Sequence, residues 1–443
     1  MSIVYNVKGL LRAVLPEQIF LAYHRMLAAF GAMVYRHPSR KMVVIGVTGT
    51  KGKTSVVYLL SDILRHAGEK VGFISGTSFR IADESWPNLL KMTMPGRFKL
   101  QKLLRQMVDA GCTYAIVETT SEGIRQHRQR GIEYDVAVLT NLSPEHIESH
   151  GSFEKYREAK GRLFASLGGS YRKVLDGKKI PKVKILNRDD EHFNYFTNYF
   201  SDSTYFFSTD PSKDGEDIFV AKDISLHGDK SEFMVRETKF SIPLIGQHNA
   251  YNSLTAITTC SALGVSLNTI KEALQKTHPP PGRLEEIKNS KGFHVFVDYA
   301  HEPASLRAAF ESVRLLQPHR LISVLGSQGG GRDKSKRSVM GGLAAEFADM
   351  VIVTNEDPYD EPPQDIIDDV IKGVVMFGRK KFTEGNNLLK IIDRREAINK
   401  AISLAQKKDV VLISGKGGEQ IMVVKGGKHI PWNDAEIAKK CLR

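Results

Sequence analysis

Short apolar runs that end in glycine or polar residues recur along the chain from residue 42 onward. The first occupies residues 42–47, and similar runs lie at 71–74, 114–118 and 136–140. The amphipathic stretch at 55–67, directly after the first run, predicts a helix. Buried strands that alternate with helices are typical of a parallel α/β sheet, whose functional side chains collect at the carboxyl ends of the strands.

The pattern changes after residue 200. Residues 202–243 contain aromatic and apolar segments separated by charged residues and glycine, which predicts a small antiparallel insertion. A helix is expected at 250–263. The run His278-Pro279-Pro280-Pro281-Gly282 cannot continue a helix, so it predicts a linker.

A second series of apolar runs follows the linker, at 295–297, 321–325, 350–354 and 410–413. This series predicts a C-terminal Rossmann-like α/β domain. The expected domains are an N-terminal extension at 1–42, a central parallel-sheet domain at 43–281 and the C-terminal domain at 282–443.

Composition narrows the class of protein. A chain of 443 residues with 41% hydrophobic and 26% charged residues is too long for one core. Its cysteines, Cys112, Cys260 and Cys441, form no CxxC pair, which argues against a disulfide framework or zinc cluster and favours the cytoplasm. The net charge of +13 favours anionic partners. Nucleic acid is disfavoured because only 8% of residues are aromatic and no run of five basic residues occurs.

Residues 1–42 carry six basic side chains and one acid, Glu17. Their apolar stretch at 19–35 is interrupted by His24 and Arg25, so neither a membrane-spanning helix nor a cleavable signal is expected. Two interpretations stay open: a helix packed on the body of the protein, or a surface helix that contacts a membrane or a protein partner.

The strongest chemical signal is Gly46-Val47-Thr48-Gly49-Thr50-Lys51-Gly52-Lys53-Thr54, between a predicted strand and a predicted helix. It lacks the first glycine of the strict GxxxxGK[ST] spacing but keeps Gly52-Lys53-Thr54. Backbone N–H groups of such a P-loop converge on phosphate oxygens, Lys53 can reach the terminal phosphates, and the Thr54 hydroxyl can bind Mg²⁺. Glu118, at the end of another predicted strand, can supply a carboxylate to the same ion.

Further motifs accompany this loop. In the first half of the chain they are Glu118-Thr119-Thr120-Ser121-Glu122-Gly123, Thr140-Asn141-Leu142-Ser143-Pro144-Glu145-His146, and Tyr156 with Ala159-Lys160. In the second half they are Gly246-Gln247-His248-Asn249 with Asn252, Gly282-Arg283-Leu284-Glu285, Asp298-Tyr299-Ala300-His301, Gly331-Arg332-Asp333 and Gly415-Lys416-Gly417-Gly418-Glu419. Together they resemble the Mur ligase family, in order and approximate spacing, over residues 43–434. Within the family, the chain is most similar to the muramyl-tripeptide synthetase branch.

The resemblance implies an ATP-dependent amide ligase of peptidoglycan synthesis that forms ADP and phosphate through an acyl phosphate. It implies ATP and Mg²⁺, a carbamylated Lys160, a muramyl-peptide acceptor and an amino acid. The implied catalytic residues are Lys53, Glu118, His146 and Lys160, of which the last three, with Thr54, hold metal ions. The implied ATP-binding residues are Gly49, Thr50, Lys51, Gly52, Lys53, Thr54, Ser55, Asn252, Arg283, Asp298 and His301. Those implied to bind the acceptor are Thr93, Thr120, Gln126 and Arg128, and those implied to bind the amino acid are Arg332, Glu356, Asp357, Gly415 and Glu419.

The chain also departs from the family pattern. Complete members begin with a UDP-sugar domain, and because only 42 residues precede the first predicted strand, we expect that domain to be absent. The loop that reads Asp-Asn-Pro-Arg in enzymes that add meso-diaminopimelate is Glu356-Asp357-Pro358-Tyr359 here. Tyr359 offers no guanidinium for a second carboxylate, so that amino acid is disfavoured and lysine or another amine is expected. Gly418 replaces a histidine, and Glu145 replaces an aspartate.

Two other functions stay open at this point. One is a ligase similar to folylpolyglutamate synthase, which shares the phosphate loop. The other is a non-catalytic ATP-binding scaffold. We expect the protein in the cytoplasm, and at the inner face of the membrane if residues 1–42 form a surface helix.

Overall fold

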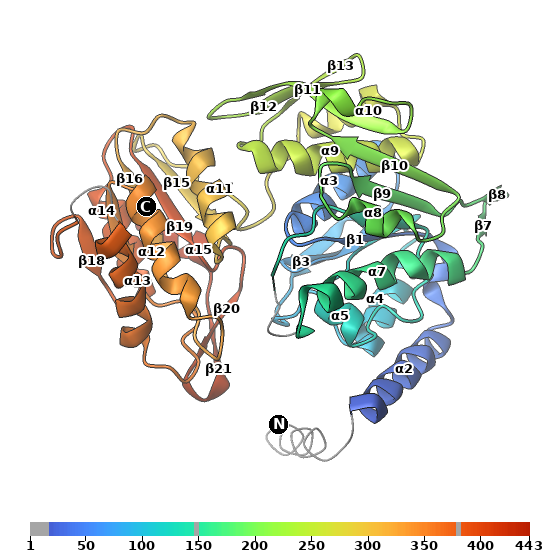
Figure 1. The fold of residues 1–443 in the computed structure, drawn as a ribbon, viewed down its shortest axis with the longest axis horizontal. Coiled ribbons are helices and arrows are strands. Elements are labelled where there is room, and N and C mark those ends of the chain that lie inside the picture. The colour runs from blue at the N-terminus through green and yellow to red at the C-terminus, as the bar shows by residue number, and fades with distance from the viewer. Residues whose placement is uncertain (1–16, 146–149, 378–381) are drawn as a thin grey trace. The chain divides into compact units, whose positions relative to one another are not determined.

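The computed structural model describes residues 17–145, 150–377 and 382–443. The chain divides into two compact units. The first runs to Lys222 and adds Met234–Lys239 and Tyr251–Leu274, and the second comprises Asp223–Phe233, Phe240–Ala250 and Gln275–Arg443. Figure 1 shows the elements of both units along the chain.

An eleven-stranded sheet dominates the first unit, in the order β13-β12-β11-β10-β9-β6-β1-β5-β2-β3-β4. Its strands are β1 (Val43–Thr48), β2 (Val71–Ile74), β3 (Ser78–Ile81), β4 (Glu84–Pro87), β5 (Tyr114–Glu118), β6 (Val136–Leu139), β9 (Val183–Asn187), β10 (Ser203–Ser208), β11 (Ile218–Leu226), β12 (Ser231–Val235) and β13 (Thr238–Ile242). The predicted buried strands are confirmed: every residue of β1, β2 and β6 is buried. Strands buried on both faces read as continuous apolar runs, which is why the sequence displayed them clearly.

Helices cover this sheet. They are α3 (Lys53–His66), α4 (Arg97–Asp109), α5 (Ser121–Arg125), α7 (Phe153–Gly169), α8 (Phe193–Thr197), α9 (Gln247–Ala262) and α10 (Leu267–Leu274), with a short hairpin of β7 (Val174–Leu175) and β8 (Lys178–Lys179) and a 3₁₀ turn at Pro211–Lys213. Buried residues of α4, α7 and α8 share one core cluster with β1, β5 and β6. On α3 the buried residues include Val56, Leu60 and Ile63, and this helix packs against α10.

The antiparallel insertion predicted at 202–243 is only partly right. β10 pairs in parallel with β9 and also with β11, so it extends the parallel sheet. Only the segments from β11 to β13 are joined by turns short enough to require antiparallel neighbours. β10 is half-buried along most of its length.

The second unit contains a six-stranded sheet in the order β14-β15-β19-β16-β17-β18. Its strands are β14 (Glu285–Glu286), β15 (His294–Asp298), β16 (Leu321–Leu325), β17 (Met350–Val353), β18 (Leu388–Lys390) and β19 (Val410–Ser414), and its helices are α11 (Pro303–Arg314), α12 (Ser335–Phe347), α13 (Pro363–Phe377), α14 (Arg394–Leu404) and α15 (Asp434–Leu442). A ribbon of β20 (Ile421–Val424) and β21 (Lys428–Pro431) lies outside this sheet, with a 3₁₀ turn at Lys425–Gly427 between its strands.

Alternate strand residues divide between two cores in this unit. Val351 and Val353 join the core with α11, α12 and α13, whereas Ile352 joins the core with α14 and α15. Successive strand side chains point to opposite faces, so this division places helices on both faces of the sheet. Within the six-stranded sheet, all strand pairs except β14–β15 are parallel. The Rossmann-like prediction is therefore confirmed.

Helix α2 (Glu17–Val34) precedes β1 and packs against α4, and a 3₁₀ turn at Pro38–Lys41 connects it to the sheet. Among the described residues, no helix combines the length and hydropathy that crossing a bilayer requires.

Candidate active site

The P-loop lies at the carboxyl edge of the first sheet, where three parallel strands end side by side. In the registers of these strands, Val47 of β1 is level with Glu118 of β5, and Thr48 is level with Leu139 of β6. Residues that follow β5 and β6 must therefore flank the loop at 49–54. The strand order also changes direction around β1, which is where ligands bind in open α/β sheets.

Two glycines give the loop its shape. Gly49 has φ +148°, and a Cβ there would lie 1.9 Å from Thr140 Oγ1. Gly52 has φ +82°, and a Cβ there would lie 2.2 Å from Asn252 Oδ1. Because a side chain fits at neither position, only glycine lets the loop backbone pass this close to Thr140 and Asn252.

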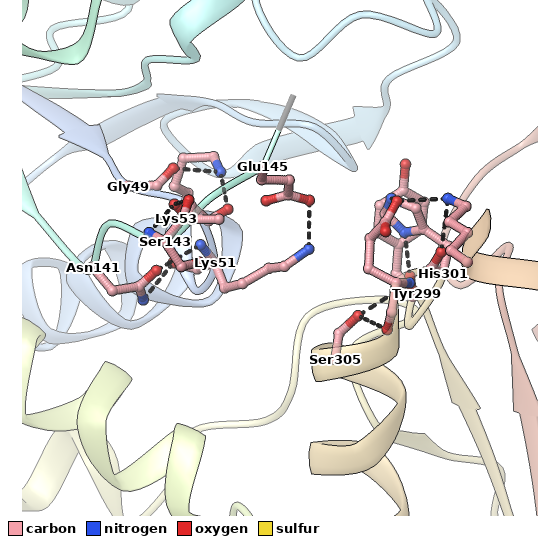
Figure 2. Close-up of polar contacts among 12 residues, drawn as sticks. Gly49, Lys51, Lys53, Asn141, Ser143, Glu145, Tyr299, His301 and Ser305 are labelled. Atoms are coloured by element: carbon pink, nitrogen blue, oxygen red, sulfur yellow. Dashed lines mark hydrogen bonds and ion pairs between the residues drawn. The ribbon is translucent and has the colours of Figure 1, made fainter. Parts of the chain in front are cut away.

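Lys53 and Thr54 begin α3 immediately after the loop. Lys53 Nζ turns back to donate to the carbonyl oxygens of Gly49 (2.9 Å) and Thr50 (2.8 Å), as Figure 2 shows. Thr54 Oγ1 donates to Glu118 Oε2 over 3.0 Å, and Gly76 N donates to the same oxygen over 2.8 Å. The strand end and the helix start thus bring a hydroxyl and a nearly fully buried carboxylate together.

Lys160 of α7 is the least expected member of the site. Its side chain is buried, Nζ donates to Gly49 O over 2.7 Å, and it lies 4.4 Å from the centre of the Tyr156 ring. Among the described residues, no carboxylate pairs with it. Burial, together with the charge of Lys53, holds the pKa of Lys160 well below its usual value. Burial therefore favours the neutral amine here more than in a surface lysine.

Further contacts fix the loop against β6 and α7. Thr50 Oγ1 donates to Ser143 O (3.2 Å) and lies 3.1 Å from the Tyr156 hydroxyl. Lys51 pairs with Glu145 at 2.7 Å, and its backbone N–H donates to Asn141 Oδ1 over 2.9 Å (Figure 2). Burial raises the pKa of Tyr156, so its hydroxyl stays protonated and can donate.

The predicted acceptor residues gather around α5. Thr120 caps this helix by accepting from Gly123 N, and Arg128 donates to Gln126 Oε1 (2.8 Å) and to the carbonyl oxygen of Met94. Thr93 and Glu118 both lie beside Gly76. A Cβ built on Gly76 would be 3.2 Å from Thr93 Oγ1 and 3.7 Å from Glu118 Oε2.

Arg97 is a member of this group that the sequence did not reveal. Its guanidinium donates to Gln126 O, and burial, together with the charge of Arg128, lowers its pKa to about 10. Two half-buried guanidinium groups, Arg97 and Arg128, therefore flank the same glutamine and create a site for an anionic group.

In the second unit, the predicted residues again follow the carboxyl ends of strands. Asp298 ends β15, its Oδ2 accepts from Leu284 N (2.7 Å) and its Oδ1 accepts from Ala300 N (2.8 Å). The guanidinium of Arg283 lies over the Tyr299 ring at 4.4 Å. His301 Nδ1 lies 2.7 Å from Tyr299 O, just before α11, as Figure 2 shows. Burial raises the pKa of Asp298.

The residues that we predicted to bind the amino-acid substrate lie at the same edge of the second sheet. Glu356 follows β17, is fully buried, and neither of its carboxylate oxygens accepts a hydrogen bond from any described residue. A Cβ at Gly415 would lie 2.2 Å from Glu356 Oε2, so the glycine admits this side chain. Burial raises the pKa of Glu356 to about 7, although the charge of Arg394 opposes the rise.

The neighbouring charges are paired. Lys416 Nζ pairs with Asp357 (2.9 Å) and Glu419 (2.5 Å), and Asp357 Oδ1 also accepts from Val423 N over 2.8 Å. Arg332, in the loop before α12, is exposed. Tyr359 has φ +52° and packs its ring against Gly330.

Comparison with known proteins decides the family. Residues 47–260 match the Mur ligase middle domain, and residues 282–417 match the Mur ligase glutamate ligase domain. The chain belongs to the Mur ligase family. Mur ligases are ATP-dependent enzymes that form ADP and join an amino acid to a peptidoglycan precursor, so this chain is an ATP-dependent ligase of cell-wall synthesis.

Similar sequences come from the tripeptide-synthetase branch. This Mur ligase is 36% identical over 427 residues to the UDP-N-acetylmuramoyl-L-alanyl-D-glutamate–2,6-diaminopimelate ligase of Geobacillus thermodenitrificans, covering 95% of this chain and 82% of the relative. It is 35% identical over 422 residues to the UDP-N-acetylmuramyl-tripeptide synthetase of a Roseiflexus species, covering 94% of this chain and 81% of the relative.

Solved structures agree with the fold. A 2,6-diaminopimelate ligase structure with 27% identity covers 94% of this Mur ligase and 82% of its own chain, with a TM-score of 0.62. The folylpolyglutamate synthase of Mycobacterium tuberculosis has a TM-score of 0.66 at 17% identity, covering 88% of this chain and 92% of its own, and shows a shared fold.

The residues of this Mur ligase fit the ATP and Mg²⁺ that the family uses. Thr54 and Glu118 offer hard oxygen atoms 3.0 Å apart, which suits a small divalent cation that retains water and phosphate ligands. The backbone of the loop at residues 49–54, with glycine at 49 and 52, suits phosphate oxygens.

The structure brings most first-unit predictions together. Gly49 to Ser55, Glu118, Lys160 and Asn252 surround one loop, and Thr93 lies beside Glu118. His146 lies outside the described residues, so its predicted metal role remains a prediction. Thr140 and Asn141 bond to Lys51 of the loop and Gly76 bonds to Glu118, and none of the three was among the predicted site residues.

Proposed function

We propose that this Mur ligase joins an amino acid to the free carboxylate of a muramyl-peptide acceptor, as a tripeptide synthetase. The observation that carries the proposal is the set of groups around the P-loop: the Thr54–Glu118 pair and the buried Lys160 both lie against it. A phosphate loop used only to sense ATP needs no buried amine beside it.

The proposed reaction has two steps. An acceptor carboxylate oxygen attacks the γ-phosphorus of ATP, and the bond to the β–γ bridging oxygen breaks, which gives an acyl phosphate and ADP. The amine of the amino acid then attacks the acyl carbon, inorganic phosphate leaves, and the amine loses a proton. Activation is required because a carboxylate oxygen is a poor leaving group until it is phosphorylated.

The side chains act through charge and position. Lys53 exchanges its contacts with Gly49 O and Thr50 O for phosphate oxygens, and the loop N–H groups neutralise charge as it develops. Thr54 and Glu118 would hold one Mg²⁺ ion and His146 a second metal ion, and these ions would neutralise phosphate charge. We propose that Asn252, Arg283, Asp298 and His301 contact the nucleotide, and that Thr93, Thr120, Gln126 and Arg128 hold the acceptor.

We propose that Lys160 carries a carbamate. The surroundings lower the pKa of its buried amine, and the neutral amine can add to CO₂ and lose a proton, which gives an anion able to bind a metal ion. Lys160→Ala should lose ligation and regain part of it with added acetate or formate, since a free carboxylate can occupy the space. Failure of every short carboxylate to restore turnover, with the metal content unchanged, would contradict the carbamate.

We propose that the added amino acid has a cationic side-chain end and no second carboxylate. Glu356 is buried without a hydrogen-bond partner among the described residues, so an ammonium group of the substrate would satisfy it. Tyr359 offers no guanidinium for a second carboxylate. Lysine and ornithine should therefore support ADP release at lower concentrations than meso-diaminopimelate. Tyr359→Arg should lower the concentration of meso-diaminopimelate that is needed.

The decisive experiment measures ADP release with pairs of co-substrates. Turnover that requires both UDP-N-acetylmuramoyl-L-alanyl-D-glutamate, or its dipeptide acceptor, and an amino acid supports the proposal. Turnover with tetrahydrofolate and glutamate would instead assign folylpolyglutamate synthesis, and ATP binding without turnover would assign a scaffold. The mass of the product identifies the amide formed.

We propose that the reaction takes place in the cytoplasm and that residues 1–42 contact a membrane or a protein. The domains would be the 43–281 and 282–443 segments predicted from the sequence. None of the proposed site residues lies in residues 1–42, so this contact is independent of the chemistry.

A further inference from the structure

Helix α2 has two unlike faces. Toward α4 it presents small residues: Ala28, Gly31 and Ala32 are buried, and Gly31 lies against Phe98 and Gln101. Gly131 also meets this face, since a Cβ there would lie 2.9 Å from Ala32 Cβ. These contacts hold α2 on the first unit and leave its opposite side outward (Figure 1).

The outward side is a continuous apolar stripe. Ile19, Tyr23, Met26, Phe30 and Met33 follow each other at spacings of four and three residues, which places them in one line along the helix. Each side chain is more than half exposed, from 52% for Ile19 to 68% for Met26. Large apolar groups exposed in a contiguous row mark a surface that is covered by something else.

The charges beside the stripe are positive. Arg25, at its edge, is exposed, and so are Arg36 and Lys41 beyond the end of the helix. Glu17 is the only acidic residue among the first 61 residues.

This pattern suits lipid better than another helix. In a helix pair, charges at the positions flanking the apolar line set the register and choose the partner. The exposed residues that directly flank the line are Ala22, Ala29 and Val34, which carry no charge, and the exposed Arg25 lies one step further round the helix. A second copy of the chain would bring like charges together without acids to compensate them, whereas an anionic lipid surface matches both the apolar row and the basic edge.

We infer that the outer face of α2 docks the protein on an anionic lipid surface, with the apolar stripe at the boundary between head groups and acyl chains and the basic residues on the head groups. The helix lies along the surface, since its inner face is occupied by α4. Docking would place a ligase that makes a cell-wall precursor next to a membrane, and it extends the proposed function without depending on it.

Vesicle co-sedimentation of the full chain tests this inference. The wild type should bind phosphatidylglycerol vesicles and should bind phosphatidylcholine vesicles weakly, with binding reduced at high ionic strength. Met26→Glu should weaken binding to phosphatidylglycerol by about tenfold or more, because an apolar contact is replaced by a repelled charge. Phe30→Glu should act in the same direction, although Phe30 also packs edge-on against Phe98.

Met376→Glu is the matched control. Met376 of α13 is 72% exposed, so this variant makes the same chemical change on a methionine outside the stripe, and binding should not change. Equal loss in both variants, or equal binding to neutral and anionic vesicles, would overturn the inference. Light scattering that reveals a dimer abolished by Met26→Glu, without vesicle binding by the wild type, would assign the stripe to a second copy. Because vesicle binding requires no ATP, its failure is distinguishable from failure of the ligase activity.

Discussion

Replacing Lys160 with methionine should abolish ligation and leave the protein as stable as before, or more stable. Lys160 is buried, and its ammonium form has no carboxylate partner among the described residues. Methionine keeps most of the apolar stem and removes the ionisable group. The usual consequence of mutating a buried residue, a large loss of stability, is therefore not expected here.

Two opposing effects set the change in the free energy of unfolding that Lys160→Met causes. Losing the hydrogen bond from Lys160 Nζ to Gly49 O costs about 1 kcal/mol. Each unit by which burial lowers the pKa of the amine costs the folded state about 1.4 kcal/mol at a pH below the folded-state pKa, and the substitution removes that cost. A lowering of one unit is enough to offset the hydrogen bond.

The pH dependence provides an independent check. The unfolded chain keeps the lysine proton up to about pH 10.5, whereas the folded chain releases it at lower pH. Between these two pKa values the unfolded state binds more protons, so the free energy of unfolding of the wild type rises with pH. Lys160→Met should lack this rise, which amounts to about 1.4 kcal/mol per pH unit at most.

Urea unfolding in CO₂-free buffer at several pH values, together with ADP release, measures both effects. Lys173→Met is the matched control, because Lys173 is also buried and burial also lowers its pKa, to about 8, but it pairs with Asp135 and donates to Met42 O. Removing a partner from a buried ion pair should lower stability by about 3 kcal/mol or more. The reasoning is refuted if Lys160→Met loses as much stability as Lys173→Met, or if its unfolding keeps the wild-type pH slope.

Three further predictions concern the two sheet edges. Glu118→Gln should reduce turnover by about 10²- to 10³-fold and raise the Mg²⁺ concentration needed for ADP release, since it removes charge from the proposed ion site; unchanged Mg²⁺ dependence would contradict that role. Gly52→Ala should weaken ATP binding in calorimetry and lower the free energy of unfolding by about 1–2 kcal/mol or more. The reason is that φ of Gly52 is +82° and the new Cβ would meet Asn252 Oδ1. Normal ATP affinity would contradict this prediction. The pKa of Glu356 is raised to about 7, so its ionisation opposes folding increasingly as pH rises from about 4.5 to 7. Glu356→Gln should therefore raise the free energy of unfolding in urea at pH 8 by up to about 3 kcal/mol, and it should raise the KM for the amino acid. A loss of stability would show that Glu356 has a structural partner.

The sequence predicted those parts of the site that follow buried parallel strands. Glu118 was identified because an apolar run ends at it, and the register that levels it with Val47 explains why it reaches the loop. Lys160 could be named only through the family resemblance, because on a helix it reads as an exposed lysine. Its burial depends on the packing of α7 against the loop.

Other features depend on packing that no local pattern records. Arg97 lies at the start of an amphipathic helix, where a solvent-exposed arginine is expected, and its contact with Gln126 O joins segments 29 residues apart. β10 lies in the segment where the sequence predicted an antiparallel insertion, yet its partners on both sides are parallel. In the second unit, the missing partner of Glu356 became visible only when its neighbours were placed.

Buried charges among the described residues differ in how they are paired. Asp135 binds both Lys173 and Lys182, and Arg394 binds Asp434 through two nitrogen atoms, all with side chains fully buried. A buried ion stabilises a fold only when such partners offset its desolvation. Lys160 and Glu356 are buried at the carboxyl edges of the two sheets without an oppositely charged partner in hydrogen-bond contact among the described residues, so each destabilises the fold. A residue that costs stability where ligands bind is best explained by a group that arrives with the reaction: CO₂ or metal at Lys160, and an ammonium at Glu356.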